Sequence, residues 1–116
     1  MATLEQERAA FAWEHVQGCS RDYMNLAKGA PALIMNNGLM QTLAFYASKG
    51  KPQHKTLNQH LLRWLHKRGL VKAATFAEAM SSLHKADSAD YRRTTEEAMA
   101  LLKWIRQFAA AVTTDA

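Results

Sequence analysis

The stretch YRRTTEEAMALLKWIRQFAAAV, residues 91–112, carries the clearest structural pattern in the chain. Its inward positions follow one another in alternating steps of three and four residues, which places them on one face of a helix. These positions are Tyr91, Thr94, Ala98, Leu101, Ile105, Phe108 and Val112. Such a long amphipathic helix needs neighbours to cover its apolar face, so the stretch predicts a helical core. Residues 113–116 are expected to fray.

Two helices are predicted before residue 49. The first opens with Thr3 and Gln6, a capping-box pair, and continues to about Ala27. Its inner face carries Ala9, Ala12, Val16, Cys19, Tyr23 and Leu26. Gly29-Ala-Pro31 is expected to end this helix and begin the next, because Pro suits a first helical turn. Residues 32–48 are apolar nearly all round, which is typical of a buried central helix.

The segment 29–48 contains no charged residue and is long enough to span a bilayer. However, Asn36, Asn37 and Gln41 make it a poor insertion sequence. We therefore predict a core helix and no membrane contact. These three polar residues could cap a helix, bond across helices or touch a ligand, and the sequence leaves the choice open.

Residues 49–90 contain a third and a fourth predicted helix. Lys49-Gly-Lys-Pro52 is typical of a turn, and Gly69 is well placed to end the helix that follows it. That helix has two faces: Leu57, Leu61, Trp64 and Leu65 on the apolar one, and Thr56, His60, Arg63 and Lys67 on the solvated one. Thr75 and Glu78 form a second capping-box pair. They are expected to open a short helix with Phe76, Met80 and Leu83 inward, followed by a polar linker over residues 84–90.

Length and composition fit this helical interpretation. The chain has 116 residues, 48% of them hydrophobic, with five Gly and two Pro, too few turn residues for a β-sandwich. We predict an all-α fold, a single compact bundle of about five helices covering residues 1–116. Cys19 has no partner for an internal disulfide, and the first residues lack a signal-peptide pattern. A cytoplasmic location is expected.

Charge is unevenly distributed along the chain. The formal net charge is +5, yet residues 23–77 contain eight lysines and arginines and no acidic residue. An acid-free segment of this kind favours a polyanion as partner, and phosphate is the commonest one. The alternative is a solvated basic face that serves solubility alone.

Catalytic and metal-binding patterns are missing from the sequence. His54, His60 and His66 are spaced six residues apart, so they do not share a helix face. Neither a Gly-rich phosphate loop nor a His-Glu-x-x-His motif occurs. His60, together with Lys55 or Lys67, offers residue types that a metal-free ribonuclease site uses. We expect instead no catalytic residue, no metal and no cofactor.

Two segments carry specific motifs. One is residues 36–49, with the core Gly38-Leu-Met-Gln-Thr-Leu-Ala-Phe45, and the other is residues 91–109, with Tyr91-Arg-Arg-Thr-Thr-Glu-Glu-Ala followed by Leu101-Leu-Lys-Trp104. Together they resemble a known family, the small helical subunit of the type III-B CRISPR effector, the Cmr complex. The chain length and the leading Gln6-Glu-Arg-Ala9 also fit. Residues 52–90 match only in character, as a basic helix and a variable stretch.

The resemblance implies a non-catalytic role in antiviral defence. Such small subunits stack in several copies as the inner filament of an RNA-guided ribonucleoprotein, beside the backbone and large subunits of the Cmr complex. Their basic surface lines the channel where target RNA pairs with the CRISPR RNA. The expected partners are therefore the other Cmr subunits, further copies of the chain, and both RNAs.

The candidate RNA-binding residues come mainly from the acid-free segment: Lys49, Lys51, Lys55, Arg63, Lys67, Arg68 and, more weakly, Arg92. Arg92 is weaker because an ion pair with Glu96 would also explain it. The motif residues are expected to pack in the core, namely Leu39, Leu43, Ala44, Phe45, Leu101, Leu102 and Trp104. Gly38 is expected to allow two helices to cross closely.

Two alternatives stay open at the level of sequence. One is a free-standing helical DNA-binding or adaptor protein, because residues 57–69 and 70–83 could imitate a helix-turn-helix. The other is the small subunit of the sister type III-A complex.

Overall fold

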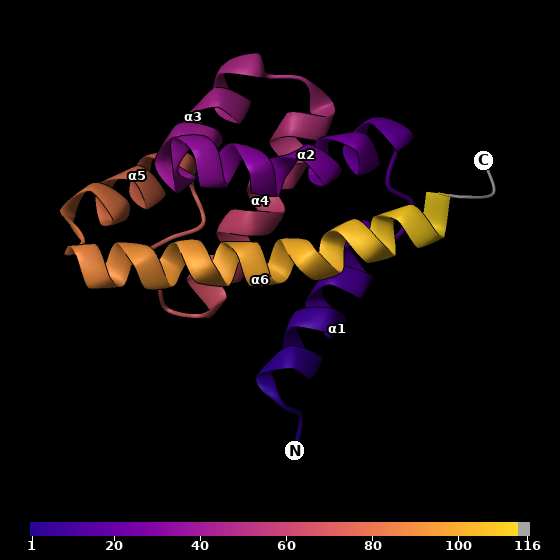
Figure 1. The fold of residues 1–116 in the computed structure, drawn as a ribbon, viewed down its shortest axis with the longest axis horizontal. Coiled ribbons are helices and arrows are strands. Elements are labelled where there is room, and N and C mark those ends of the chain that lie inside the picture. Colours follow the sequence, from indigo (N-terminus) through magenta and orange to yellow (C-terminus); the bar gives the residue numbers. More distant parts are fainter. Residues whose placement is uncertain (114–116) are drawn as a thin grey trace.

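The longest helix organises the structure, a computed structural model that describes residues 1–113. Six helices are present in this part of the chain: α1 (Leu4–Val16), α2 (Arg21–Asn37), α3 (Leu39–Lys49), α4 (Pro52–Lys67), α5 (Phe76–Lys85) and α6 (Ser88–Thr113). Helix α6 crosses the whole molecule, α2 lies alongside it, and α4 lies behind both (Figure 1). The all-α prediction is confirmed, with six helices rather than five.

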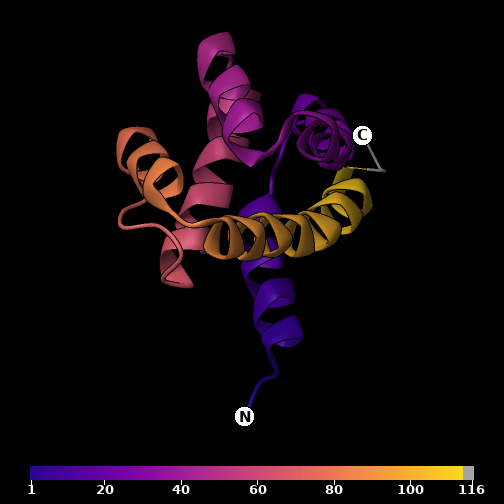
Figure 2. The ribbon, with the colours of Figure 1, turned by 60° about the vertical axis from the view of Figure 1, so that its left-hand side comes forward.

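The N-terminal prediction of one helix to about Ala27 is wrong. Helix α1 ends at Val16, and Gly18 has a positive φ of 71°, which turns the chain. Ser20 then caps α2, because its side chain accepts a hydrogen bond from the Tyr23 amide. The apolar stripe continues through both helices, so periodicity alone hides the break. As a result α1 points away from the body, and its first turns project outward in both ribbon views (Figures 1 and 2).

The next helix boundary is Gly38, not Gly29-Ala-Pro31. Pro31 lies inside α2, which continues to Asn37 because the core packing of α2 outweighs the backbone hydrogen bond that proline removes. Gly38 has a φ of 89°, which a side chain would strain. An added Cβ there would lie 3.6 Å from the Tyr91 hydroxyl, an ordinary contact distance. Gly38 therefore serves the turn between α2 and α3, and the expected close helix crossing is not its role.

Turns and caps around α4 and α5 agree with the sequence. Gly50 takes the left-handed conformation before α4, and Gly69 has a φ of 74° after it. Thr75 caps α5 by accepting a hydrogen bond from the Glu78 amide, but the Glu78 side chain does not return a bond to Thr75, so the predicted capping box is only half formed. Residues 68–75 connect α4 to α5, which is longer than the turn of a helix-turn-helix.

The predicted linker over residues 84–90 is mostly helical. Only Ala86 and Asp87 separate α5 from α6. Asp87 starts α6 early, because its side chain accepts a hydrogen bond from the Asp90 amide at 2.8 Å. At the other end α6 continues through Thr113, which is buried. The predicted fraying of Thr113 is thus wrong, and the rest of that prediction lies outside the described residues.

The core fills the space between α6 and the helices packed on it. Leu39, Leu43, Leu101 and Leu102 are buried as expected, whereas Ala44 and Trp104 are half-buried. Two aromatic predictions are wrong: Phe45 is 45% exposed and Phe76 is 38% exposed. Phe45 lines one pocket with Gln41, and Phe76 lines another with Gln59, so each ring is only partly covered. Within residues 1–113 no helix is both long and apolar enough to cross a membrane.

Candidate nucleic-acid interface

Helix α4 exposes a single basic face. It packs against α2, α3 and α6, and these contacts bury Leu57, Leu61 and Leu65. The remaining face carries Lys55, Arg63 and Lys67, all of them exposed. We call these three residues the basic stripe. Its side chains fall on one side of the helix because they are spaced by eight and then four residues along the chain.

The other predicted cations extend the basic stripe at both ends. Lys49 is the last residue of α3, Lys51 is the N-cap residue of α4, and Arg68 is its C-cap residue. All three are exposed. Aromatic rings support two of the lysines: the Lys49 ammonium lies 5.2 Å from the centre of the Phe45 ring, and the Lys67 ammonium lies 6.0 Å from the Trp64 ring. These contacts place the charges without neutralising them.

None of these cations forms an ion pair in the described part of the chain, although the charge of Arg68 helps to lower the pKa of the Glu97 carboxyl. The ion pairs within residues 1–113 are Arg8 with Glu5, Arg8 with Glu97, and Arg93 with Asp90. Unpaired, exposed positive charges on one face raise the local concentration of anions. The predicted cluster therefore lies on one continuous segment, α4 with its two ends. Its members are Lys49, Lys51, Lys55, Arg63, Lys67 and Arg68.

Arg92 lies apart from this cluster, on α6. It is exposed and lines an open pocket with Tyr91 and Thr95. The Arg92–Glu96 ion pair considered from the sequence is not among the pairs in residues 1–113. Arg92 is thus available to an anion, although not as part of the α4 surface.

His60 does not lie on the solvated face, contrary to the sequence pattern. It is 8% exposed, and its Nδ1 is hydrogen-bonded to the Tyr23 hydroxyl at 2.7 Å. The His15 ring packs against it edge to face, with ring centres 5.0 Å apart. Burial, helped by the nearby charges of His15 and Arg63, lowers the pKa of His60 to about 4. The imidazole is therefore neutral at neutral pH and contributes no charge to the basic stripe.

A pocket of about 240 Å³ opens beside His60. His15, Cys19, Tyr23 and Thr56 are among its lining residues. Cys19 is half-buried rather than enclosed, and burial raises the pKa of its thiol. Its thiolate is therefore scarce at neutral pH. Burial likewise raises the pKa of Tyr23, so the hydroxyl keeps its proton and its hydrogen bond to His60.

The polar residues Asn36, Asn37 and Gln41 all reach solvent. Asn37 and Gln41 line a shallow pocket of about 260 Å³, together with the exposed ring of Phe45. They form no interhelical hydrogen bond in the structure, so the option of bonding across helices is excluded for residues 1–113. Of the options left open by the sequence, contact with a ligand at the surface remains for these three residues.

The sequence did not reveal a largely buried ion pair that also contacts α4. The Glu97 carboxylate accepts hydrogen bonds from Arg8 Nε at 2.7 Å, from Arg8 Nη2 at 2.8 Å and from the Trp64 indole at 2.9 Å. These three residues belong to α1, α4 and α6. The Arg8 guanidinium, with the Trp64 indole, lowers the pKa of the Glu97 carboxyl. No local signal could have found this contact, since Arg8 and Glu97 lie near opposite ends of the chain.

The fold and its surface define a small, all-helical, basic protein with a candidate polyanion-binding face. A family model described as CRISPR-associated protein (Cas_Cmr5) matches residues 4–112. The CRISPR system Cmr subunit Cmr5 of Thermus thermophilus is 33% identical over 117 residues, covering 97% of both chains. The chain belongs to the Cmr5 family of CRISPR-associated proteins.

A solved structure agrees with this assignment. The X-ray crystal structure of a CRISPR-associated Cmr5 family protein, also from Thermus thermophilus, superposes with a TM-score of 0.82 at 30% sequence identity. The match covers 97% of this chain and 99% of that one. The resemblance seen in residues 38–45 and 91–104 is therefore confirmed over nearly the full length.

Proposed function

We propose that this protein is a non-catalytic structural subunit of a type III-B CRISPR (Cmr) ribonucleoprotein. In the proposal it stacks in several copies and holds guide and target RNA by their phosphate backbone. The relative from Thermus thermophilus is named as a Cmr subunit, which supports the assembly. The observation that carries the RNA contact is the row of exposed, unpaired cations along α4.

The geometry of the basic stripe suits a backbone rather than a base sequence. An α-helix rises about 1.5 Å per residue, so Arg63 and Lys67 are separated by about 6 Å along α4. That spacing is similar to the distance between successive phosphates of one strand. Phosphate contacts position a strand without reading its bases, and in guide-based recognition the reading is done by base pairing. The affinity of one copy is expected to be low, with strength coming from several copies in a row.

The histidine arrangement supports a non-catalytic role. A general acid must carry a proton near the operating pH, and a general base needs a free nitrogen within reach of its substrate. The pKa of His60 is about 4, and Nδ1 is engaged by Tyr23. We infer that RNA cleavage and cyclic-nucleotide chemistry belong to other subunits.

The test is a charge reversal on the basic stripe, made in the complex assembled with the other Cmr subunits. Arg63→Glu with Lys67→Glu is expected to lower target-RNA occupancy, because two phosphate contacts become repulsive. If one subunit neutralises about three phosphates, log K falls with log salt at a slope of about −2, and the double variant has a shallower slope. RNA occupancy is measured by filter binding across a salt titration.

A matched control separates the basic stripe from net charge. Arg21→Glu with Lys85→Glu makes the same charge change at exposed positions on α2 and α5. We expect this control to bind RNA like the parent. Equal RNA binding by the stripe variant and the parent would mean that the stripe is only a solvated face. Failure of the parent chain to assemble with Cmr subunits would contradict the subunit assignment itself.

A further inference from the structure

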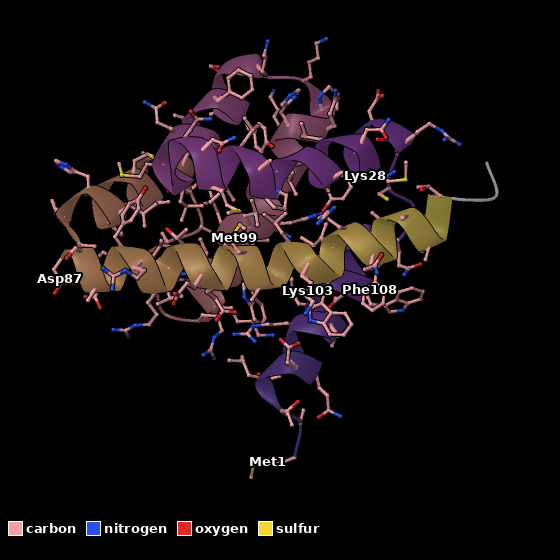
Figure 3. The ribbon with its side chains drawn as sticks, in the orientation of Figure 1. Met1, Lys28, Asp87, Met99, Lys103 and Phe108 are labelled. Carbon is pink, nitrogen blue, oxygen red and sulfur yellow. The ribbon has the colours of Figure 1, made fainter. Side chains whose placement is uncertain are left out.

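A second group of cations gathers on a different part of the surface, where α2 and α6 run side by side. Lys28 of α2 and Lys103, Arg106, Gln107 and Ala110 of α6 line a pocket of about 270 Å³, which we call the seam pocket. Figure 3 labels Lys28 and Lys103 on these two neighbouring helices. No sequence pattern indicates this group, because Lys28 and Lys103 are far apart along the chain.

The residues that line the seam pocket carry positive or neutral polar side-chain ends, apart from Ala110. Its five lining residues include three cations and no carboxylate. None of the three cations takes part in an ion pair within residues 1–113, and all three are exposed. On α2 the nearest acid is Asp22, in the first turn of the helix, and on the described part of α6 it is Glu97, which is held by Arg8. Among residues 1–113, therefore, no ion pair compensates the charge in the pocket.

We propose that the seam pocket binds a phosphate group of a single RNA strand, as a second contact separate from the basic stripe. Three cations can surround the oxygens of a phosphodiester, and the Gln107 amide adds a neutral donor. A protein partner with an acidic surface is the competing occupant. It fits less well, because protein interfaces have an apolar centre and Ala110 is the one apolar residue in the lining.

The position of the seam pocket makes it independent of the basic stripe. Helix α4 lies behind α2 and α6 in Figure 1, and the basic stripe is the face of α4 that these helices leave uncovered. An RNA strand at the seam pocket therefore meets a different side of the molecule. Disruption of either surface by mutation is expected to leave the other in place, so the two proposals can fail separately.

The experiment uses the full chain and a short oligouridylate at low salt, followed by NMR chemical-shift titration. The backbone amides around Lys28, Lys103 and Arg106 are expected to shift, as well as those of α4. Lys28→Gln with Lys103→Gln is expected to weaken the oligouridylate affinity roughly three- to tenfold, uniformly across sequences. It is also expected to reduce the salt slope by about 0.7 for each phosphate that the variant no longer neutralises.

The control is Lys72→Gln with Lys85→Gln, which removes the same charge from exposed positions outside the seam pocket. It is expected to keep the parent affinity. An equal drop in oligouridylate affinity for both variants would mean that net charge alone explains the effect. The proposed site would then be wrong. Shifts confined to α4 would also overturn it.

Two further probes identify the ligand. Inorganic phosphate is expected to bind far more weakly than the oligouridylate, since a strand holds its phosphate in place through neighbouring contacts. Equal binding of phosphate alone would make the seam pocket a small-anion site and contradict the proposal. So would an oligoglutamate peptide that binds the parent more tightly than the oligouridylate, because the partner would then be an acidic protein.

Discussion

Arginine serves two opposite purposes in this molecule, in the interior around Glu97 and on the basic stripe of α4. Arg8 is mostly buried, its side chain 17% exposed, and gives three nitrogens to two carboxylates. Arg63 is exposed, and no acid pairs with it in residues 1–113. A charge that is fully paired stabilises the fold and is unavailable to a ligand. A charge left unpaired adds little stability and keeps its field for a partner.

The largest effect is expected where a paired charge is deprived of its partner. Glu97→Ala removes the acceptor of Arg8 Nε, Arg8 Nη2 and the Trp64 indole in a largely buried contact, and leaves Arg8 only its bond to the exposed Glu5. Removing one member of a buried ion pair costs about 3 kcal/mol or more of unfolding free energy. Chemical denaturation measures the change, and Glu96→Ala on the exposed side of α6 serves as the control, expected within about 0.5 kcal/mol. Similar stability of both variants would show that the Glu97 network does not hold the helices together.

A smaller effect is expected from protonating His60. The pKa of His60 is lowered from 6.5 to about 4 in the folded protein, so the unfolded chain takes up the proton first as pH falls. The stability contribution of neutral His60 is therefore present above pH 6.5 and disappears between pH 6.5 and about 4. Over this window the free energy of unfolding is expected to drop by up to about 3 kcal/mol.

Comparison with His60→Gln isolates this contribution, since glutamine keeps a hydrogen-bonding group near Tyr23 and does not titrate. The variant is expected to show a flatter dependence of stability on pH than the parent. Acid also weakens the Glu97 ion pair, whose carboxyl has a lowered pKa, so both proteins become somewhat less stable at low pH. Identical pH profiles would mean that His60 is not buried neutral in solution.

The smallest effect on stability is expected at the basic stripe. Arg63→Ala and Lys67→Ala remove exposed, unpaired side chains, so each is expected to change the free energy of unfolding by no more than about 0.5 kcal/mol. Thermal unfolding by circular dichroism measures this change. A destabilisation of more than about 1 kcal/mol, the size expected of a structural contact, would show that the stripe supports the fold and would remove the contrast with Arg8.

Residues with local signals were predicted well from the sequence. The capping pair Thr3 and Gln6 forms its two reciprocal hydrogen bonds, and Thr75 caps α5 as expected. The apolar stripe of residues 91–112 became the central helix, and the cations around α4 are exposed. These features depend on neighbours within one helical turn, so a single chain segment contains all the information needed.

The helix breaks before residue 39 were predicted poorly, whereas the turns at Gly50 and Gly69 were predicted correctly. Pro31 suggested a helix boundary, yet α2 continues past it. The packing of Ala27, Ala30 and Ile34 in the core outweighs the one backbone hydrogen bond that proline removes. Gly38 supplied the real boundary through its positive φ. The sequence alone does not indicate whether a glycine adopts a positive φ. The contacts around the glycine decide this.

The sequence alone was sufficient to predict an all-helical fold, to locate a segment without acidic residues and to indicate the family. These properties depend on composition, periodicity and short motifs. Which polar residues are covered depends instead on how the helices pack. His60 shares the spacing of Arg63 and Lys67, yet α1 and α2 bury it against His15 and Tyr23. Glu97 and Arg8 meet across the chain, and Lys28 meets Lys103 at the seam pocket. Contacts between distant segments arise from the packing of whole helices, and spacing within one helix does not encode them.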